Sequence, residues 1–294
     1  IVGGRGRERP NSPPGAPAPP PPGWAHRARK RAPQDAAGRQ GDPNAVDELV
    51  GIARDSQRPA IVRATALSLL TQYPPMPVLQ NVVFDALVDP EPLVRGQAVT
   101  LAEYMFNLSV FRTGPRNAPQ EAQQALQAVD AMAELLDDPV RYVRTEAARA
   151  LAAVAHVQFA DESRKQTKQF KAALDEYRAG QDALLDQPGT HLNLGILSER
   201  LGDPNQAVDA YHTALRLDPT FFLARNNLAM LYDQLGQPAK AEEQMREIVR
   251  LRPNEAQWPY SLGLLIGQKA TEAEQQIEQL RRSRDPAMRA EIER

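Results

Sequence analysis

The chain has 294 residues, of which 42% are apolar and only 5% aromatic, and its formal net charge is −2. So few aromatic residues disfavour a large β-sheet, and the composition favours packed helices instead. Cysteine is absent, which excludes disulfides, thiolate metal sites, a cysteine nucleophile and haem attachment through Cys-x-x-Cys-His within these residues.

Residues 1–41 are predicted to be a disordered segment rich in proline and arginine. Their prolines, as in PNSPPGAPAPPPPG, remove backbone donors and favour an extended chain. Residues 1–40 hold eight basic and two acidic side chains, whereas the remainder holds 27 basic and 35 acidic ones. A basic tail therefore precedes a mildly acidic body, and the tail has too few apolar residues to offset the entropy of ordering.

From residue 42 the pattern predicts pairs of amphipathic helices. Proline separates the two members of each pair, and proline fits the first turn of a helix but not its interior. The second member of each pair opens with Val-Arg, at Val62-Arg63, Val94-Arg95 and Val143-Arg144. The segments DPEPLVRGQA and DPVRYVRTEA resemble the inter-helix signature of HEAT-type repeats, which are antiparallel helix pairs stacked into a solenoid.

The resemblance implies that residues 42–157 form HEAT-like repeats. It also implies that an Asp-Pro pair caps each second helix, through Asp89 and Asp138, and that small apolar residues after it pack inward. The inward-facing residues would be Val94, Ala98, Val143 and Ala147. The polar stretch that follows, residues 158–169, is predicted to be a linker.

A second pattern recurs at an interval of 34 residues. The stretch RLGDPNQAVDAYHTALRLDP, beginning at Arg200, is matched 34 residues later by QLGQPAKAEEQMREIVRLRP. This interval and its Leu-Gly, Ala and Pro positions resemble the tetratricopeptide repeat. The resemblance covers residues 170–286 and implies two full helix pairs and a third that starts at Trp258, with 287–294 as a tail.

The fold class predicted from both patterns is all-α, an α-solenoid of stacked antiparallel helix pairs. Small residues at Gly195 and Ala207 are expected where two helices cross, because they permit close approach. Tyr211 is expected to fill the space beside that crossing, and Pro219 to end the second helix of its pair. A single pair cannot bury its apolar face alone, so neighbouring pairs must stack.

A search for chemistry along the chain finds no catalytic residue, no metal site and no cofactor site. The four histidines form no His-x-x-x-His spacing, and no glycine-rich phosphate loop is present. The basic runs lack interleaved aromatic residues, so no nucleic-acid partner is expected. The longest apolar stretch, SLGLLIG, is far shorter than the roughly 20 residues that span a bilayer, and no membrane insertion is expected. The sequence does not predict an enzyme.

The predicted function is a protein-interaction scaffold with a concave surface. In tetratricopeptide proteins the first helix of each pair lines this surface, so the resemblance implies a groove for a protein or peptide partner. The candidate groove residues are Asn193, Ile196, Glu199, Arg200, Asn226, Asn227, Met230, Asp233 and Gln234. Ile196 and Met230 stand where a clamp for C-terminal carboxylates would place asparagine, so an amphipathic ligand is expected instead.

An alternative function comes from a different resemblance. Helix pairs opening with RPAIVRATALSLL and continuing into 34-residue repeats are similar to the C-terminal part of bacterial multihaem c-type cytochromes. Under that interpretation the chain is a fragment of an exported electron-transfer protein whose haem motifs lie before Ile1, and its location is periplasmic. A stand-alone scaffold would be cytoplasmic.

Overall fold

The computed structural model describes residues 45–106, 108 and 119–282. The segment 1–41 and the tail 287–294, for which the sequence predicts no packed structure, lie outside these residues. Every regular element among the described residues is a helix, which confirms the predicted all-α class. The chain divides into two units, residues 1–74 and 75–294.

In the described part of the first unit, residues 45–74, α2 (Val46–Arg54) and α3 (Ala60–Leu70) form a helix pair. The two helices pack against each other, and Leu49, Leu67 and Leu70 on them are almost fully buried. Arg63 is also buried, and its Nε donates to the carbonyl oxygen of Ala53 at 3.2 Å. This bond fixes the end of α2 against the first turn of α3.

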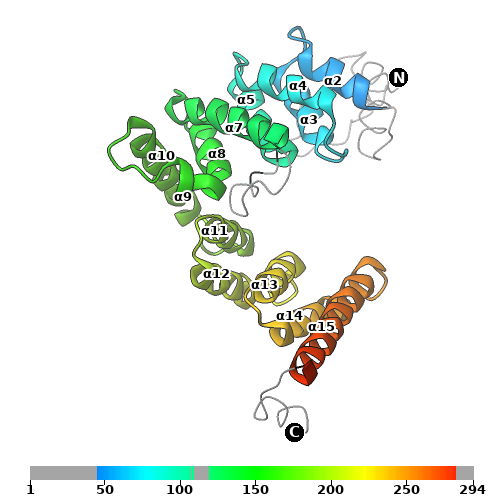
Figure 1. Ribbon diagram of the computed structural model, residues 1–294. Coiled ribbons are helices and arrows are strands. Elements are labelled where there is room, and N and C mark those ends of the chain that lie inside the picture. Colours follow the sequence, from blue (N-terminus) through cyan, green and yellow to red (C-terminus); the bar gives the residue numbers. More distant parts are fainter. Residues whose placement is uncertain (1–44, 107, 109–118, 283–294) are drawn as a thin grey trace, which may run out of the picture. The chain divides into compact units, whose positions relative to one another are not determined.

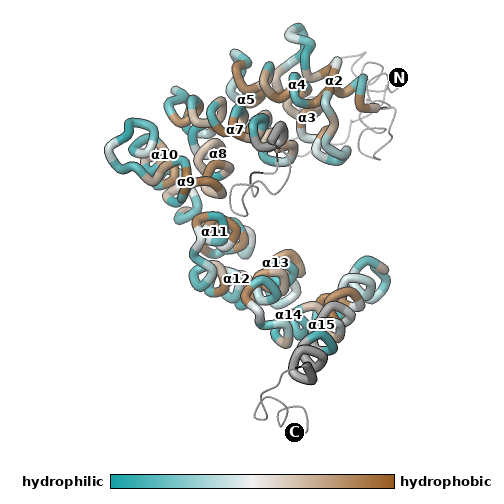
Figure 2. Tube along the Cα trace, viewed as in Figure 1, coloured by the Kyte–Doolittle hydropathy of each residue, from teal (hydrophilic) through white to brown (hydrophobic). Residues whose placement is uncertain are grey.

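The second unit is a succession of helices in which each packs against others that lie near it in the chain (Figure 1). Its first half comprises α4 (Pro77–Leu87), α5 (Pro92–Phe106), α7 (Pro119–Glu134), η2 (Leu135–Asp137), α8 (Arg141–Leu151), η3 (Ala152–Val154), α9 (Ala155–Gln158) and α10 (Lys165–Asp182). Its second half comprises α11 (Pro188–Arg200), α12 (Pro204–Leu217), α13 (Phe222–Gln234), α14 (Pro238–Leu251) and α15 (Gln257–Arg282). Most helices carry both hydrophobic and hydrophilic stretches (Figure 2), as helices that bury one face do.

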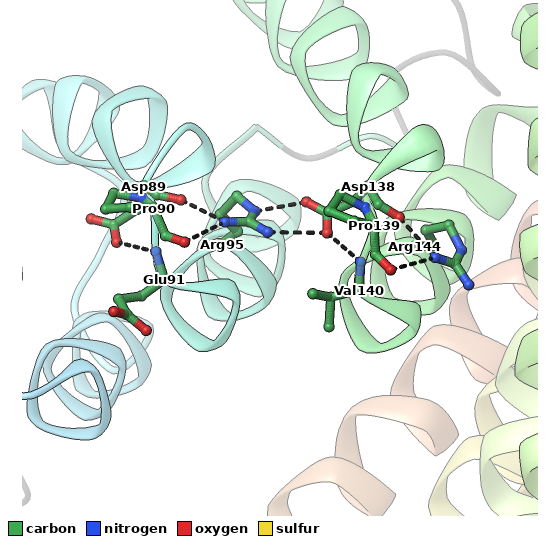
Figure 3. A network of polar contacts seen from close by, with 8 residues as sticks. All are labelled: Asp89, Pro90, Glu91, Arg95, Asp138, Pro139, Val140 and Arg144. Atoms are coloured by element: carbon green, nitrogen blue, oxygen red, sulfur yellow. Dashed lines mark hydrogen bonds and ion pairs between the residues drawn. The ribbon is translucent and has the colours of Figure 1, made fainter.

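Polar side chains join successive pairs in the first half of the second unit (Figure 3). The guanidinium of Arg95 on α5 makes two bonds to the Asp138 carboxylate, at 2.7 and 3.0 Å, and its Nη1 donates to the carbonyl oxygens of Asp89 and Pro90. Asp138 also accepts from the backbone N–H of Val140 at 2.8 Å. One arginine therefore holds its own loop and the next loop along the chain.

The same arrangement is repeated one step further along the chain. Arg144 on α8 donates from Nη1 to the carbonyl oxygens of Asp138 and Pro139, and its other nitrogens bind Glu176 on α10. Glu176 thus takes the place that Asp138 has in the preceding step. The result is a ladder of arginine–carboxylate pairs that runs from α5 through α8 to α10.

The expected capping role of the two aspartates is wrong in its detail. Asp89 and Asp138 accept from the N–H groups of Glu91 and Val140, which precede α5 and α8, and the N-cap residue of α8 makes no side-chain cap bond. Each aspartate folds a turn ahead of the helix, because its short side chain reaches the backbone two residues on. The predicted inward packing is confirmed, since Val94, Ala98, Val143 and Ala147 are fully buried.

The repeated Leu-Gly-x-Pro of the 34-residue pattern ends one helix and starts the next. Gly202 and Gly236 have φ of +81° and +68°, a region that favours glycine. Around Gly202 the N–H groups of Gly202 and Asp203 bond to the carbonyl oxygens of Glu199 and Ser198, at 3.1 and 2.9 Å. These bonds form a Schellman motif, and the proline two residues after each glycine then occupies the first turn of α12 or α14.

Inside the first of these pairs, α11 and α12 cross at Gly195. A Cβ added at Gly195 would lie 2.4 Å from Cε1 of Tyr211, so only glycine lets the ring lie here. Tyr211 and Ala207 are both fully buried. The close approach predicted at Gly195 is confirmed.

Two helices differ from the expected pattern. α10 begins at Lys165, inside the predicted linker, and packs mainly against α8 rather than α11. α15 is one helix of 26 residues where the third repeat would turn. The counterparts of Leu235 and Gly236 are Lys269 and Ala270, and no proline follows them. The turn is missing because nothing in the sequence ends the helix there.

Candidate functional site

The predicted groove residues lie on α11 and α13, the first helices of the two pairs. Six of them line one hollow of about 290 Å³ between these helices. These are Ile196, Glu199, Arg200, Asn227, Met230 and Gln234. The structure therefore brings together side chains that are as far as 38 positions apart in the sequence.

The other three predicted residues do not line this hollow. Asn193 and Asp233 are exposed on the same two helices, and the Asn226 amide lies 3.6 Å from the Met230 sulfur. All three could meet only the part of a ligand that extends beyond the hollow.

One charged residue of the hollow, Glu199, is held by the helix crossing beneath it. The buried Tyr211 hydroxyl donates a hydrogen bond to the Glu199 carboxylate. Burial, together with this bond and the carboxylate charge, raises the pKa of Tyr211 far above its usual value of about 10, and a hydrogen bond from Asn227 opposes the shift. Tyr211 is therefore neutral in the folded protein and fixes the direction of Glu199.

The other charged residue, Arg200, belongs to an ion cluster that joins three helices. It binds Glu103 on α5 and donates to the carbonyl oxygen of Arg149 at 3.0 Å. Arg149 in turn binds Glu103 and Glu146, each at 3.0 Å. All four side chains are about one-fifth exposed, so the cluster lies largely beneath the surface.

The two arginines of this cluster respond differently to their surroundings. Burial favours the neutral form of both. For Arg149 the charges of Glu103 and Glu146 outweigh burial and raise its pKa, whereas for Arg200 burial prevails over Glu103 and lowers the pKa. Arg200 is committed to this cluster and is not a free cation for a ligand.

The side chains left for a ligand are apolar or neutral. Met230 is 53% exposed in the hollow, beside the half-buried Ile196. Gln234, which is exposed, supplies an amide that can donate and accept hydrogen bonds. The hollow suits an apolar side chain flanked by backbone polar groups, and it offers no arrangement for covalent chemistry.

A larger hollow of about 410 Å³ lies among α10, α11 and α12. Leu194, Leu197 and Ala210 form its apolar part, and Arg178 and Asp182 lie at its α10 edge. It exists because α10 packs on α8 and leaves this face of the α11–α12 pair partly uncovered. No local sequence pattern indicates this hollow, since its cause is the position of a different helix.

Within the described ranges, no group of three or more His, Asp or Glu residues is placed to hold a metal ion. Among the same residues, no helix has both the length and the apolar character needed to cross a bilayer.

One family model matches part of the chain. Residues 200–260, which contain α12, α13 and α14, match the family model of the tetratricopeptide repeat. No curated protein matches the sequence. Among solved structures, a thermophilic TPR protein of Thermus thermophilus matches at 18% identity, over 75% of this chain and 98% of its own, with a TM-score of 0.37.

Proposed function

We propose that this protein is an interaction scaffold, and that the hollow between α11 and α13 binds a peptide segment of a partner protein. The observation that carries the proposal is the convergence of six side chains from equivalent helices of two successive pairs. The tetratricopeptide match over 200–260 supports it, because stacked helical repeats expose extended concave binding surfaces.

The chemistry of the hollow favours an amphipathic peptide. Its apolar side chains would lie on Ile196 and Met230, and its backbone groups would bond to exposed amides such as Gln234. Glu199 and Arg200 are held by Tyr211 and Glu103, so charge would contribute little to the affinity. Binding would therefore depend weakly on salt.

A library of random peptides displayed on phage, selected on the full chain, tests this proposal. Enriched peptides should carry apolar residues, and Met230→Arg should weaken their binding at least about tenfold by placing a charge in the hollow. Val157→Arg is the matched control, since Val157 is 57% exposed and lies outside the hollow. Ala210→Arg obstructs the larger hollow in the same way.

Binding that survives Met230→Arg, or that only Ala210→Arg removes, would contradict the assignment of the site. A selection that enriches no peptide at all would count against the scaffold function itself.

We further propose that residues 42–157 are HEAT-like repeats that support the binding half. The arginine–carboxylate ladder and the four buried residues Val94, Ala98, Val143 and Ala147 favour this interpretation. The linker at residues 158–169, and the idea that the chain is a fragment of a multihaem cytochrome, stay predictions from the sequence.

A further inference from the structure

The last described helix, α15, has two apolar faces, and α14 covers only one of them. Trp258, Leu262 and Leu265 pack against the buried cluster that contains Met245 and Ile248. The opposite face carries Tyr260, Gly263, Leu264 and Gly267, spaced as residues on one side of a helix are. Tyr260 is 69% and Leu264 is 58% exposed.

The two glycines on this face have no partner within the described part of the chain. A Cβ added at Gly263 or Gly267 would meet nothing within 4 Å. Glycine inside a helix is destabilising compared with alanine, a cost that close packing against the glycine can offset. Gly195, two periods before Gly263, has such packing in the Tyr211 ring that lies against it.

Large and small residues alternate along this face, in the order Tyr260, Gly263, Leu264, Gly267. If a second copy of the same helix lies against it in the antiparallel direction, Tyr260 falls opposite Gly267 of the second copy. Gly263 then falls opposite Leu264 of the second copy, and the reverse pairs follow by symmetry. Every large side chain meets a glycine, which is the condition for two helices to approach closely.

We propose that the occupant of this face is a second copy of the chain, which forms a two-fold symmetric dimer through α15. A two-fold interface requires one patch that is complementary to itself. Tyr260 and Leu264 supply the projecting side chains, and Gly263 and Gly267 supply the space that receives them, all on one helix. A different partner would need only the projecting residues or only the glycines on this face. One pair of helices is a small interface, so the dimer forms in a concentration-dependent manner.

Sedimentation equilibrium of the full chain tests the dimer. The mass should rise with concentration from 32.5 kDa towards twice that value. Leu264→Arg should weaken association at least about tenfold, because it places a charge in the centre of the interface. Val157→Arg is the matched control, since Val157 and Leu264 are almost equally exposed. A mass of 32.5 kDa at every concentration, or a dimer unaffected by Leu264→Arg, would overturn the proposal.

An exchange of two residues tests the antiparallel register. Tyr260→Gly alone puts glycine opposite glycine, and Gly267→Tyr alone puts tyrosine opposite tyrosine, so each should weaken the dimer. The double variant Tyr260→Gly/Gly267→Tyr has the composition of the parent and restores large opposite small, so it should recover association. Far-UV circular dichroism checks that all three variants keep their helices. A double variant that dimerises no better than either single variant would refute the register.

Discussion

Replacing Gly195 by alanine tests the packing on which the groove rests. The added Cβ would lie 2.4 Å from Cε1 and 2.7 Å from Cδ1 of Tyr211, so the ring must move by about 1 Å to reach ordinary contact. Overpacking of this kind costs about 1–3 kcal/mol, and the better helix propensity of alanine returns about 0.5–1 kcal/mol. The net loss of unfolding free energy should be about 1–2 kcal/mol. The displaced ring should also loosen the bond between Tyr211 and Glu199.

Urea unfolding followed by circular dichroism measures the loss, and hydrogen exchange locates it on α11 and α12. Local exchange matters because stacked repeats need not unfold in one step. Gly189→Ala is the matched control on the same helix, since its Cβ would meet nothing within 4 Å, and it should cause no loss. A Gly195→Ala protein as stable as the parent, with unchanged exchange in α12, would refute the crossing.

Three further predictions concern buried polar groups. Arg95→Met should lower the unfolding free energy by about 3–5 kcal/mol, because it leaves Asp138 buried without its cation. An unchanged urea midpoint would show that the ladder does not contribute to the unfolding free energy. The raised pKa of Tyr211 stabilises the folded parent fully below pH 10, and this stabilisation is lost as the pH rises above 10. In Tyr211→Phe the unfolding free energy should therefore fall less steeply above pH 10, by up to about 1.4 kcal/mol per pH unit. Parallel pH profiles of the unfolding free energy for parent and variant would contradict this. Glu103→Gln should speed hydrogen exchange at the end of α11, because Arg149 and Arg200 lose their shared carboxylate; equal rates in parent and variant would be evidence against the cluster.

The local features of the fold could be predicted from the sequence. The glycine and proline of each 34-residue unit determine where one helix ends and the next begins, and these are short-range effects of backbone geometry. Gly195 and Ala207 were predicted at the helix crossing because a fixed interval aligned them with a known pattern. Six of the nine groove candidates converge for the same reason.

Long-range partners could not be predicted in this way. Arg200 and Glu103 are 97 residues apart, and no local pattern links them. The sequence therefore placed Arg200 in the groove, where it does line the hollow, but gave no sign that its guanidinium also joins α11 to α5. The position of α10 likewise depends on its pairing with Arg144 through Glu176. The straight course of α15 did have a signal, because the Leu-Gly-x-Pro of the earlier units is missing there.

The central claim is that a partner peptide lies in the hollow between α11 and α13, and site-specific photo-crosslinking tests it most directly. Because the chain has no cysteine, Asp233→Cys provides a single attachment point for a photoreactive maleimide at the rim of the hollow. Val157→Cys and Ala210→Cys provide the same label outside it. Illumination with a phage-selected peptide should crosslink the peptide at position 233 and at neither control. Crosslinking confined to position 157 or 210 would contradict the claim.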